Sequence, residues 1–189
     1  MPDRVYLFDV DGTLTEPRLK IESEIKEIFL EWILTKNKKA YLVTGSDVSK
    51  TTEQLGEYFI NTCLGVFTCS GNVFRQEGKI VYSNVFDPGD EFIADLELYL
   101  DNSQWRSKKG NHIERRPGMI NFSTVGRNAN HNMRKAYERW DKVSLEREDI
   151  VAYINESYPE LEVSIGGSIS VDIYPKDKNK GQVVEKIRE

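Results

Sequence analysis

The chain has 189 residues, of which 39% are hydrophobic and 30% charged. That length supports one large core or two small ones, and no apolar run approaches the roughly 18 residues that a membrane span requires. The 26 basic and 31 acidic residues give a net charge of -5, which argues against general nucleic-acid binding. Neither Cys63 nor Cys69 has a spacing typical of a zinc site, so we expect reduced core thiols in a cytoplasmic protein without membrane partners.

Strands and helices alternate in the first part of the chain. Short apolar runs that end in acidic residues or glycine predict buried parallel strands, and a 3.6-residue apolar period predicts the helices between them. The elements expected in order are a strand at Val5–Phe8, a helix from Ile21 to Ile33, a strand at Ala40–Val43, a helix capped near Ser46 or Asp47 with Val48, Leu55, Tyr58 and Phe59 facing inward, and a strand at Val66–Cys69. This alternation is typical of a parallel α/β sheet.

After Ser70 the pattern changes to hairpins and helices, which indicates an antiparallel α+β unit inserted into the parallel one. The elements expected are a hairpin turn at 76–79, a helix with Asp87 as N-cap and Pro88 as its first residue, a strand at Met119–Val125, a helix that carries Met133, Tyr137 and Trp140, a helix beginning near Ser144, a hairpin of Leu161–Ile165 and Ser168–Tyr174, and a helix from Asn179 to Glu189. The fold class is therefore α/β. We expect a Rossmann-like core at 1–84 and 176–189 and an inserted antiparallel domain at 85–175.

The segment Asp9-Val10-Asp11-Gly12-Thr13 carries the most specific chemical signal, because it places two carboxylates at the end of the first expected strand. Asp9 could attack a phosphorus atom as a nucleophile, and Asp11 could transfer protons. Two carboxylates beside a phosphate require a hard cation such as Mg²⁺, which Asp9 and Asp11 would bind. The alternative is an acidic turn in which Asp9 caps a helix and Gly12 supplies a positive φ.

Arginine is suited to bidentate phosphate recognition, and Arg116 and Arg127 bracket an expected strand. We favour the alternative, an exposed solubilising charge, for three neighbouring cations: Arg106, Lys108 and Lys109. Arg134 lies on an expected helix and could face water.

Ser170 and Asp172 share one face of their strand, where they could bind sugar hydroxyls or simply form its hydrated side. His112 and His131 have no assigned role and are expected at the surface.

The Asp9 motif resembles that of the haloacid dehalogenase superfamily of phosphotransferases, whose first aspartate is phosphorylated. Further segments resemble the eukaryotic-type phosphomannomutase family: residues 15–21, 43–47, 53–56, 116–127 and 166–175. The resemblance extends from about Val5 to about Lys180 and keeps the order of the family's motifs. It implies a haloacid dehalogenase core with the inserted α+β domain as a cap.

The resemblance also implies residue roles. Asp9 would be the nucleophile and a metal ligand, and Asp11 the general acid/base, with its backbone carbonyl on the same metal. Thr44 or Ser46 would hold a phosphate oxygen, and Lys180 would neutralise the phosphate. The sugar-phosphate contacts would fall on Arg18, Arg116, Arg127, Arg134, Ser170 and Asp172.

The implied reaction interconverts mannose 6-phosphate and mannose 1-phosphate for GDP-mannose synthesis, with Mg²⁺ and a hexose 1,6-bisphosphate primer, in a homodimer formed through the cap. A capped sugar phosphatase that uses Asp9 and Asp11 is an alternative, as is a truncated homologue that binds phosphosugars or a partner without turnover. The superfamily's last acidic motif does not occur after Lys180. We therefore expect a metal shell short of one carboxylate and a core sheet with an unpaired edge.

Overall fold

The computed structural model describes residues 4–188, which form two compact units. The first unit ends at Asn84 and resumes at Lys178, and the second is Val85–Asp177. Within residues 4–188, no helix combines the length and the apolar character needed to cross a bilayer. The first unit contains β1 (Val5–Phe8), α1 (Ser23–Thr35), β2 (Lys39–Val43), α2 (Val48–Leu55), α3 (Glu57–Thr62), β3 (Gly65–Thr68), the 3₁₀ turn η1 (Cys69–Gly71), β4 (Val73–Gln76), β5 (Lys79–Ser83) and α7 (Gln182–Arg188).

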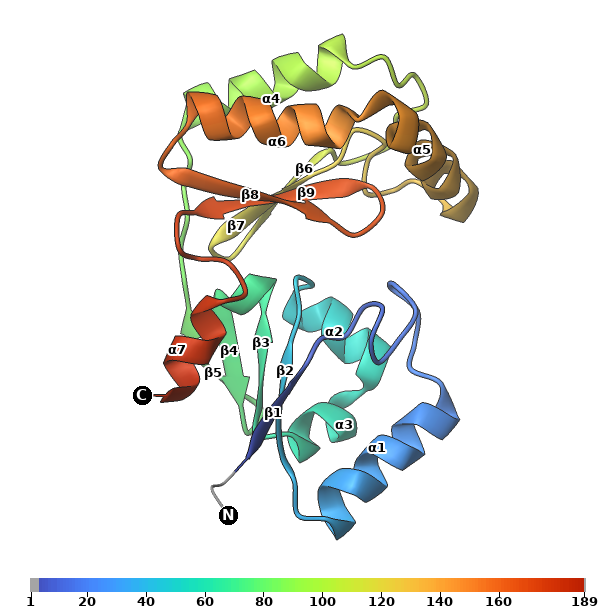
Figure 1. Ribbon diagram of the computed structural model, residues 1–189, viewed down its shortest axis with the longest axis vertical. Coiled ribbons are helices and arrows are strands. Elements are labelled where there is room, and N and C mark those ends of the chain that lie inside the picture. The colour runs from blue at the N-terminus through green and yellow to red at the C-terminus, as the bar shows by residue number, and fades with distance from the viewer. Residues whose placement is uncertain (1–3, 189) are drawn as a thin grey trace. The chain divides into compact units, whose positions relative to one another are not determined.

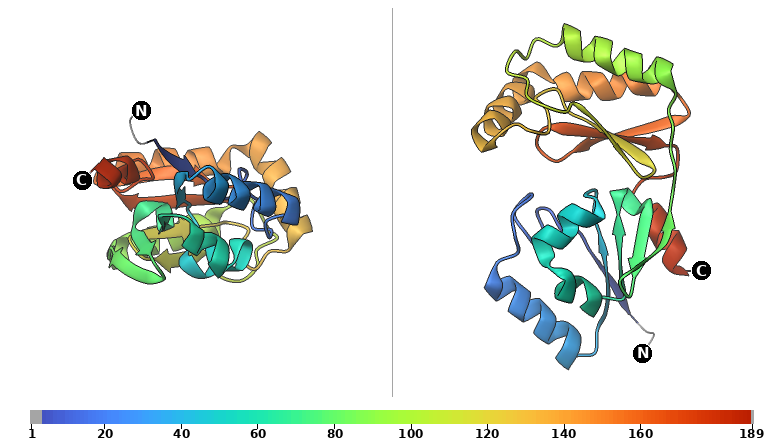
Figure 2. Two further views of the ribbon diagram at one scale, coloured as in Figure 1. Left: turned by 90° about the horizontal axis from the view of Figure 1, so that it is seen from below. Right: turned by 180° about the vertical axis from the view of Figure 1, so that it is seen from behind.

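The sheet of the first unit has the strand order β1-β2-β3-β4-β5 (Figure 1). Its first three strands are parallel, as expected, whereas β4 and β5 form an antiparallel hairpin that extends the same sheet. The helices α1 and α3 pack on one face through Phe29, Ile33 and Phe59. Val183 of α7 packs on the opposite face against Val43 and Phe67, and Figure 2 shows this arrangement from behind.

The strand β1 differs from the expectation of a buried strand. It pairs with β2 alone among residues 4–188, so it forms the edge of the sheet. Val5 and Leu7 are 39% and 43% exposed, while Tyr6 and Phe8 pack against the core on the other face. The expected unpaired edge is therefore present, and it accounts for the exposure of this apolar run.

The helix predicted after β2 is divided by Gly56, which adopts a φ of 83°. Asp47 caps its first half as expected, because its Oδ1 accepts a hydrogen bond of 2.7 Å from the Lys50 backbone N–H. Phe59 is buried in α3, but Tyr58 is 65% exposed, contrary to the expectation. The break at Gly56 turns the buried face of the helix in a different direction. A single 3.6-residue period therefore does not predict the inward-facing residues on both sides of Gly56.

The second unit is the expected antiparallel α+β fold. Its elements are α4 (Asp90–Asn102), β6 (Ile113–Arg116), β7 (Met119–Phe122), α5 (His131–Ser144), α6 (Glu146–Ser157), β8 (Leu161–Gly166) and β9 (Ser170–Pro175). The strand order is β6-β7-β9-β8, and every pair is antiparallel. The helices α4 and α6 cover one face of this sheet (Figure 1), and the core between them includes Phe92, Phe122, Ile150 and Ile173. The alternate residues point to the opposite face, which carries polar side chains.

One local expectation in this unit was wrong, and one strand was missed. The helix α4 begins at Asp90 rather than at Pro88, because Gly89 precedes it with a φ of 82° and a non-helical ψ. Asp87 therefore caps no helix, and its Oδ1 accepts a hydrogen bond from the Gly89 N–H at 3.2 Å. The strand β6 was not predicted at all. Three of its four residues are charged, so it lacks the apolar alternation by which strands are recognised.

Candidate active site

Asp9 follows directly after β1 and lies beside Lys180, which is 171 residues further along the chain. Its Oδ2 is 2.9 Å from Lys180 Nζ, and its Oδ1 accepts a hydrogen bond of 2.8 Å from the Val10 N–H. The Asp9 and Lys180 side chains are 43% and 42% exposed. A pair this exposed contributes little to stability, and it places a cation beside the Asp9 carboxylate.

The turn after Asp9 directs both carboxylates to the same end of the sheet. The Val10 carbonyl oxygen accepts hydrogen bonds from the N–H groups of residues 13, 14 and 15 at 2.9–3.2 Å. Gly12 has a φ of 80°, as the acidic-turn alternative required. Asp9 nevertheless caps no helix, because its carboxylate contacts Val10 and Lys180 instead. The conformation of the turn therefore leaves Asp9 available for chemistry.

Asp11 is held through one of its two carboxylate oxygens. Oδ1 accepts hydrogen bonds from the Arg18 backbone N–H at 2.9 Å and from Gln54 Nε2 at 2.7 Å. Oδ2 lies 3.5 Å from Ser46 Oγ, at the limit of hydrogen bonding. Arg18 contacts this centre through its backbone, at a positive φ of 66°, rather than through its guanidinium. One Asp11 oxygen is thus fixed, and the other is more weakly engaged.

Ser46 is better placed than Thr44 to meet a ligand. Thr44 is 1% exposed, and its Oγ1 accepts a hydrogen bond of 3.1 Å from the Ser46 N–H. Its backbone is also fixed, because its N–H donates to Phe67 O at 2.9 Å and its carbonyl accepts from the Ser70 N–H at 3.0 Å. Ser46 is partly exposed. Thr44 therefore holds the loop, and the Ser46 hydroxyl faces the Asp11 carboxylate.

Oxygen donors are the only metal ligands that this centre offers. Among residues 4–188, no group of three or more His, Cys, Asp or Glu side chains could hold a metal ion. Within residues 4–188, Asp9 Oδ1 accepts a hydrogen bond from the Val10 N–H alone, so it retains a lone pair for a cation. Mg²⁺ is commonly bound by one or two carboxylates together with water and substrate phosphate. Asp9 and Asp11 therefore fit Mg²⁺.

The second unit carries a row of polar side chains across the face of its sheet opposite α4 and α6. The strand register pairs Glu114 with Asn121, Asn121 with Asp172, and Asp172 with Ser164. Asn121, which is 3% exposed, donates through Nδ2 to Asp172 Oδ1 at 2.6 Å and to Ser170 Oγ at 3.1 Å. The structure thus brings Ser170 and Asp172 together, with Asn121 as the residue that joins them.

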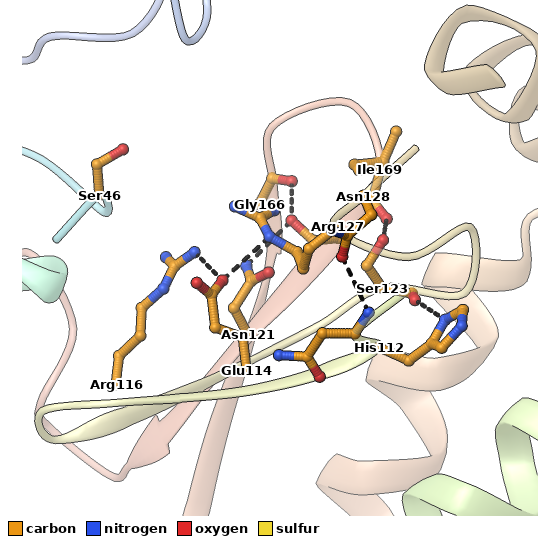
Figure 3. Close-up of polar contacts among 12 residues, drawn as sticks. Ser46, His112, Glu114, Arg116, Asn121, Ser123, Arg127, Asn128, Gly166 and Ile169 are labelled. Atoms are coloured by element: carbon orange, nitrogen blue, oxygen red, sulfur yellow. Dashed lines mark hydrogen bonds and ion pairs between the residues drawn. The ribbon is translucent and has the colours of Figure 1, made fainter. Parts of the chain in front are cut away.

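Two of the predicted phosphate-binding arginines converge on Glu114, as Figure 3 shows. Glu114 Oε2 accepts from Arg116 Nη2 at 2.5 Å and from Arg127 Nε at 3.0 Å. The Arg116 and Arg127 side chains are only 8% and 15% exposed. Arg115, by contrast, is 53% exposed in its pair with Asp87. Arg116 and Arg127 are therefore not ordinary solubilising charges.

Arg134 lies behind Arg127. Its Nε donates to Ala129 O at 2.9 Å, and its Nη2 donates to Arg127 O at 2.8 Å, so it supports the loop that carries Arg127. His112, expected at the surface, is only partly exposed, and its Nδ1 lies 2.9 Å from Ser123 O. His131 is exposed, as expected.

Sequence reasoning missed three residues of these centres: Gln54, Glu114 and Asn121. Gln54 is 2% exposed on α2, where it lies three residues from buried Thr51. The sequence feature that could have identified Gln54 was a glutamine on the buried face of a predicted helix. Glu114 faces the same side of β6 as Arg116, but that strand was itself not predicted.

The family model of the eukaryotic phosphomannomutases matches residues 27–189. The chain belongs to this family. It is 37% identical over 195 residues to a phosphomannomutase of Arabidopsis thaliana, an alignment that covers 95% of this chain and 76% of the relative. It is 35% identical over 190 residues to phosphomannomutase 1 of Dictyostelium discoideum, covering 93% of this chain and 73% of the relative. The eukaryotic phosphomannomutases are isomerases, so the chain is a member of an enzyme family.

Solved structures of other proteins share this fold. The C-terminal domain of a Candida albicans trehalose-6-phosphate phosphatase aligns with a TM-score of 0.63 at 21% identity, covering 97% of this chain and 60% of that one. A sugar phosphatase of haloacid dehalogenase subclass IIB aligns with a TM-score of 0.59 at 16% identity, covering 97% of this chain and 74% of that one. The predicted α/β fold with a separate antiparallel sheet is thereby confirmed for this phosphomannomutase family member.

Proposed function

We propose that this chain interconverts mannose 6-phosphate and mannose 1-phosphate through a phosphoryl group carried by Asp9, and so supports GDP-mannose synthesis. Membership of the phosphomannomutase family gives the reaction class. The observation that carries the proposal is the placement of Lys180 Nζ 2.9 Å from Asp9 Oδ2, with Asp11 two residues away. A carboxylate beside a fixed cation is suited to attack on a phosphate whose charge that cation neutralises.

In the first half-reaction an Asp9 oxygen forms a bond to one phosphorus of the hexose bisphosphate while the bond from that phosphorus to the sugar oxygen breaks, which leaves a hexose monophosphate. Asp11 gives its proton to that leaving oxygen as a general acid. In the second half-reaction Asp11 removes a proton from the free hydroxyl of a mannose monophosphate, which then attacks phosphorylated Asp9 and re-forms a hexose bisphosphate. Ser46 and Lys180 would bind the phosphoryl oxygens in both half-reactions. Thr44 is the less accessible alternative to Ser46.

The Asp9 carboxylate and the Asp11 backbone carbonyl would hold Mg²⁺, whose charge would stabilise the transferring phosphoryl group. Lys180 and Mg²⁺ would together offset the repulsion between Asp9 and the phosphate. Asp11 would keep Oδ2 for proton transfer, because its Oδ1 already accepts two N–H groups.

A hexose bisphosphate primer carries a second phosphate and therefore needs a second anion site. In this proposal residues 85–175 act as the cap and residues 1–84 with 176–189 as the core. Arg116 and Arg127 of the cap bind the distal phosphate, and Ser170 and Asp172 bind sugar hydroxyls. Arg18 contributes from the core, and Arg134 acts by holding Arg127.

We further propose a homodimer formed through the cap, as the family resemblance implies. Light scattering on the purified chain measures the mass in solution. A dimeric mass that falls to a monomer after substitutions on the cap surface alone agrees with the proposal, and a monomer at all concentrations contradicts it.

Phosphorus NMR of the chain with mannose 6-phosphate, Mg²⁺ and hexose 1,6-bisphosphate tests the reaction directly. We expect mannose 1-phosphate to accumulate only when the primer is present, with slow release of inorganic phosphate. Steady phosphate release that is independent of primer identifies a sugar phosphatase instead. Binding of mannose 6-phosphate without turnover identifies a non-catalytic homologue.

A further inference from the structure

Gln54 is a buried amide whose side chain ends at Asp11. It is 2% exposed, and its Nε2 lies 2.7 Å from Asp11 Oδ1, 3.2 Å from Thr15 Oγ1 and 3.2 Å from Leu19 O. Nε2 carries two hydrogens for these three acceptors. The shortest contact is the one to the carboxylate, as expected for a hydrogen bond to a charged acceptor. The main partner of this amide is therefore Asp11.

The orientation of the amide is fixed by its surroundings. The Gln54 Oε1 atom is buried and has no hydrogen-bond partner among residues 4–188. Reversing the amide would place this oxygen against the Asp11 carboxylate and the Leu19 carbonyl, where all three atoms are acceptors. A buried acceptor without a hydrogen bond is unfavourable. The observed orientation nevertheless leaves Oε1 in that state, because it directs the Nε2 hydrogens toward Asp11.

We infer that Gln54 is a positioning residue that selects which oxygen of Asp11 transfers the proton. The inference rests on the proposed function, in which Asp11 is the general acid/base. Gln54 Nε2 and the Arg18 N–H together occupy Asp11 Oδ1. Asp11 Oδ2 then remains as the oxygen that meets the sugar, and in the described part of the chain its one hydrogen-bond donor is Ser46 Oγ at 3.5 Å. Without Gln54 only the Arg18 N–H holds Asp11 Oδ1, so rotation of the carboxylate about its χ2 bond is less restricted.

The leaving group of the phosphate donor separates this role from a purely structural one. Mannose 1-phosphate needs a proton from Asp11 when its P–O bond breaks, whereas dinitrophenyl phosphate releases a stable anion that needs none. We expect Gln54→Met to lower kcat for mannose 1-phosphate about 10- to 100-fold with KM unchanged. Phosphorylation of Asp9 by dinitrophenyl phosphate should remain close to the wild-type rate. In an Asp11→Asn background Gln54→Met should add no further loss.

Gln182 offers a matched control. It is 7% exposed, its Nε2 donates to Ser70 O at 3.0 Å and to Lys178 O at 2.8 Å, and its Oε1 is also buried without a partner within residues 4–188. We expect Gln182→Met to lower stability while leaving the ratio of the two rates unchanged. If Gln54→Met folds poorly, Gln54→Glu keeps the shape but replaces the donor with an acceptor, and the same shift in the ratio is expected.

The outcomes are distinguishable. Equal loss of both rates in the Gln54 variants of an active wild type overturns the positioning role and leaves the proposed function standing. A wild-type chain that dinitrophenyl phosphate labels at Asp9, but that turns over no mannose phosphate, overturns the proposed function and with it this inference. A loss confined to the sugar phosphate supports both.

Discussion

Glu114 Oε2 lies 3.0 Å from Arg127 Nε and also accepts a hydrogen bond from Arg116, so a single carboxylate oxygen joins two guanidiniums. Both arginine side chains are at least 85% buried, whereas Glu114 is 29% exposed. The cluster carries a formal charge of +1, because two cations surround one anion. A phosphate that approaches the two arginines therefore competes with Glu114 for their N–H groups.

Replacing Glu114 by Gln tests this competition. The variant leaves two nearby guanidiniums with a weaker acceptor, so we expect its free energy of unfolding to fall by about 1–3 kcal/mol without ligand. Inorganic phosphate should raise its melting temperature more than that of the wild type. Differential scanning fluorimetry measures both. The control is Glu57→Gln, which weakens the pair between the exposed Glu57 side chain and Arg75 in the other unit. An equal phosphate effect in wild type and Glu114→Gln would contradict the competition.

Substitution of Arg127 by Ala should weaken phosphosugar binding without impairing the chemistry at Asp9. The loss of charge-assisted hydrogen bonds predicts a KM for mannose 6-phosphate raised about 10- to 100-fold. Phosphorylation by acetyl phosphate, which carries no sugar, should change little. Arg139 on α5 is an exposed arginine, and Arg139→Ala is the matched control. Equal losses with both phosphate donors would show that Arg127 does not bind the sugar phosphate.

Asp95 on α4 accepts hydrogen bonds from Tyr158 at 2.6 Å and from Tyr153 at 2.8 Å. These bonds, the one from Tyr158 above all, lower the pKa of Asp95 below its usual 3.8. The ionised form therefore stabilises the folded state fully above pH 3.8, and this contribution is lost as the pH falls through the lowered pKa. We expect Asp95→Asn to lower the free energy of urea unfolding at pH 7, with a difference that disappears below that pKa.

The control for this pH dependence is Asp101→Asn, an exposed position on the same helix. This substitution should change the free energy of urea unfolding little, both at pH 7 and below the pKa of Asp95. A difference between wild type and Asp95→Asn that stays constant from pH 7 to the acid limb would contradict the role of the Asp95 charge.

Cys63 and Cys69 are both buried and form no disulfide within residues 4–188, which confirms that they are core thiols. Burial raises the pKa of the Cys63 thiol to about 12, and its Sγ lies 3.7 Å from Phe59 O. Because the thiolate is the reactive form, we expect neither cysteine of the native protein to react readily with a thiol reagent at pH 8. Both should react once urea unfolds the chain. Rapid titration of a thiol in the native protein would contradict the packing around it.

Much of this structure could be predicted because local pattern and tertiary fold agree. The strands β1 and β2 are short apolar runs, and the Asp47 cap and the β8–β9 turn follow from local residue preferences. The two aspartates at the end of β1 could be identified because their spacing itself is the signal. Their proximity to Lys180 was implied by the family resemblance alone.

The remainder depends on contacts that no local pattern encodes. The exposure of Leu7 follows from the position of β1 at the edge of the sheet, and the sequence of β1 does not show that the strand lies there. The bond between Gln54 and Asp11 joins residues 43 positions apart. Glu114 lies in a strand whose charged residues hide its periodicity. Such positions become visible only when tertiary pairing is known.

The measurement that tests the central claim most directly is the mapping of the phosphoryl group by mass spectrometry. The chain is incubated with hexose 1,6-bisphosphate and Mg²⁺, quenched in acid and digested. We predict one phosphoryl group on the peptide that contains Asp9, and none in Asp9→Asn. The free energy of unfolding of Asp9→Asn should lie within about 1 kcal/mol of the wild-type value, because the pair with Lys180 is substantially exposed. A phosphoryl group on another residue, or equal labelling of Asp9→Asn, would contradict the account.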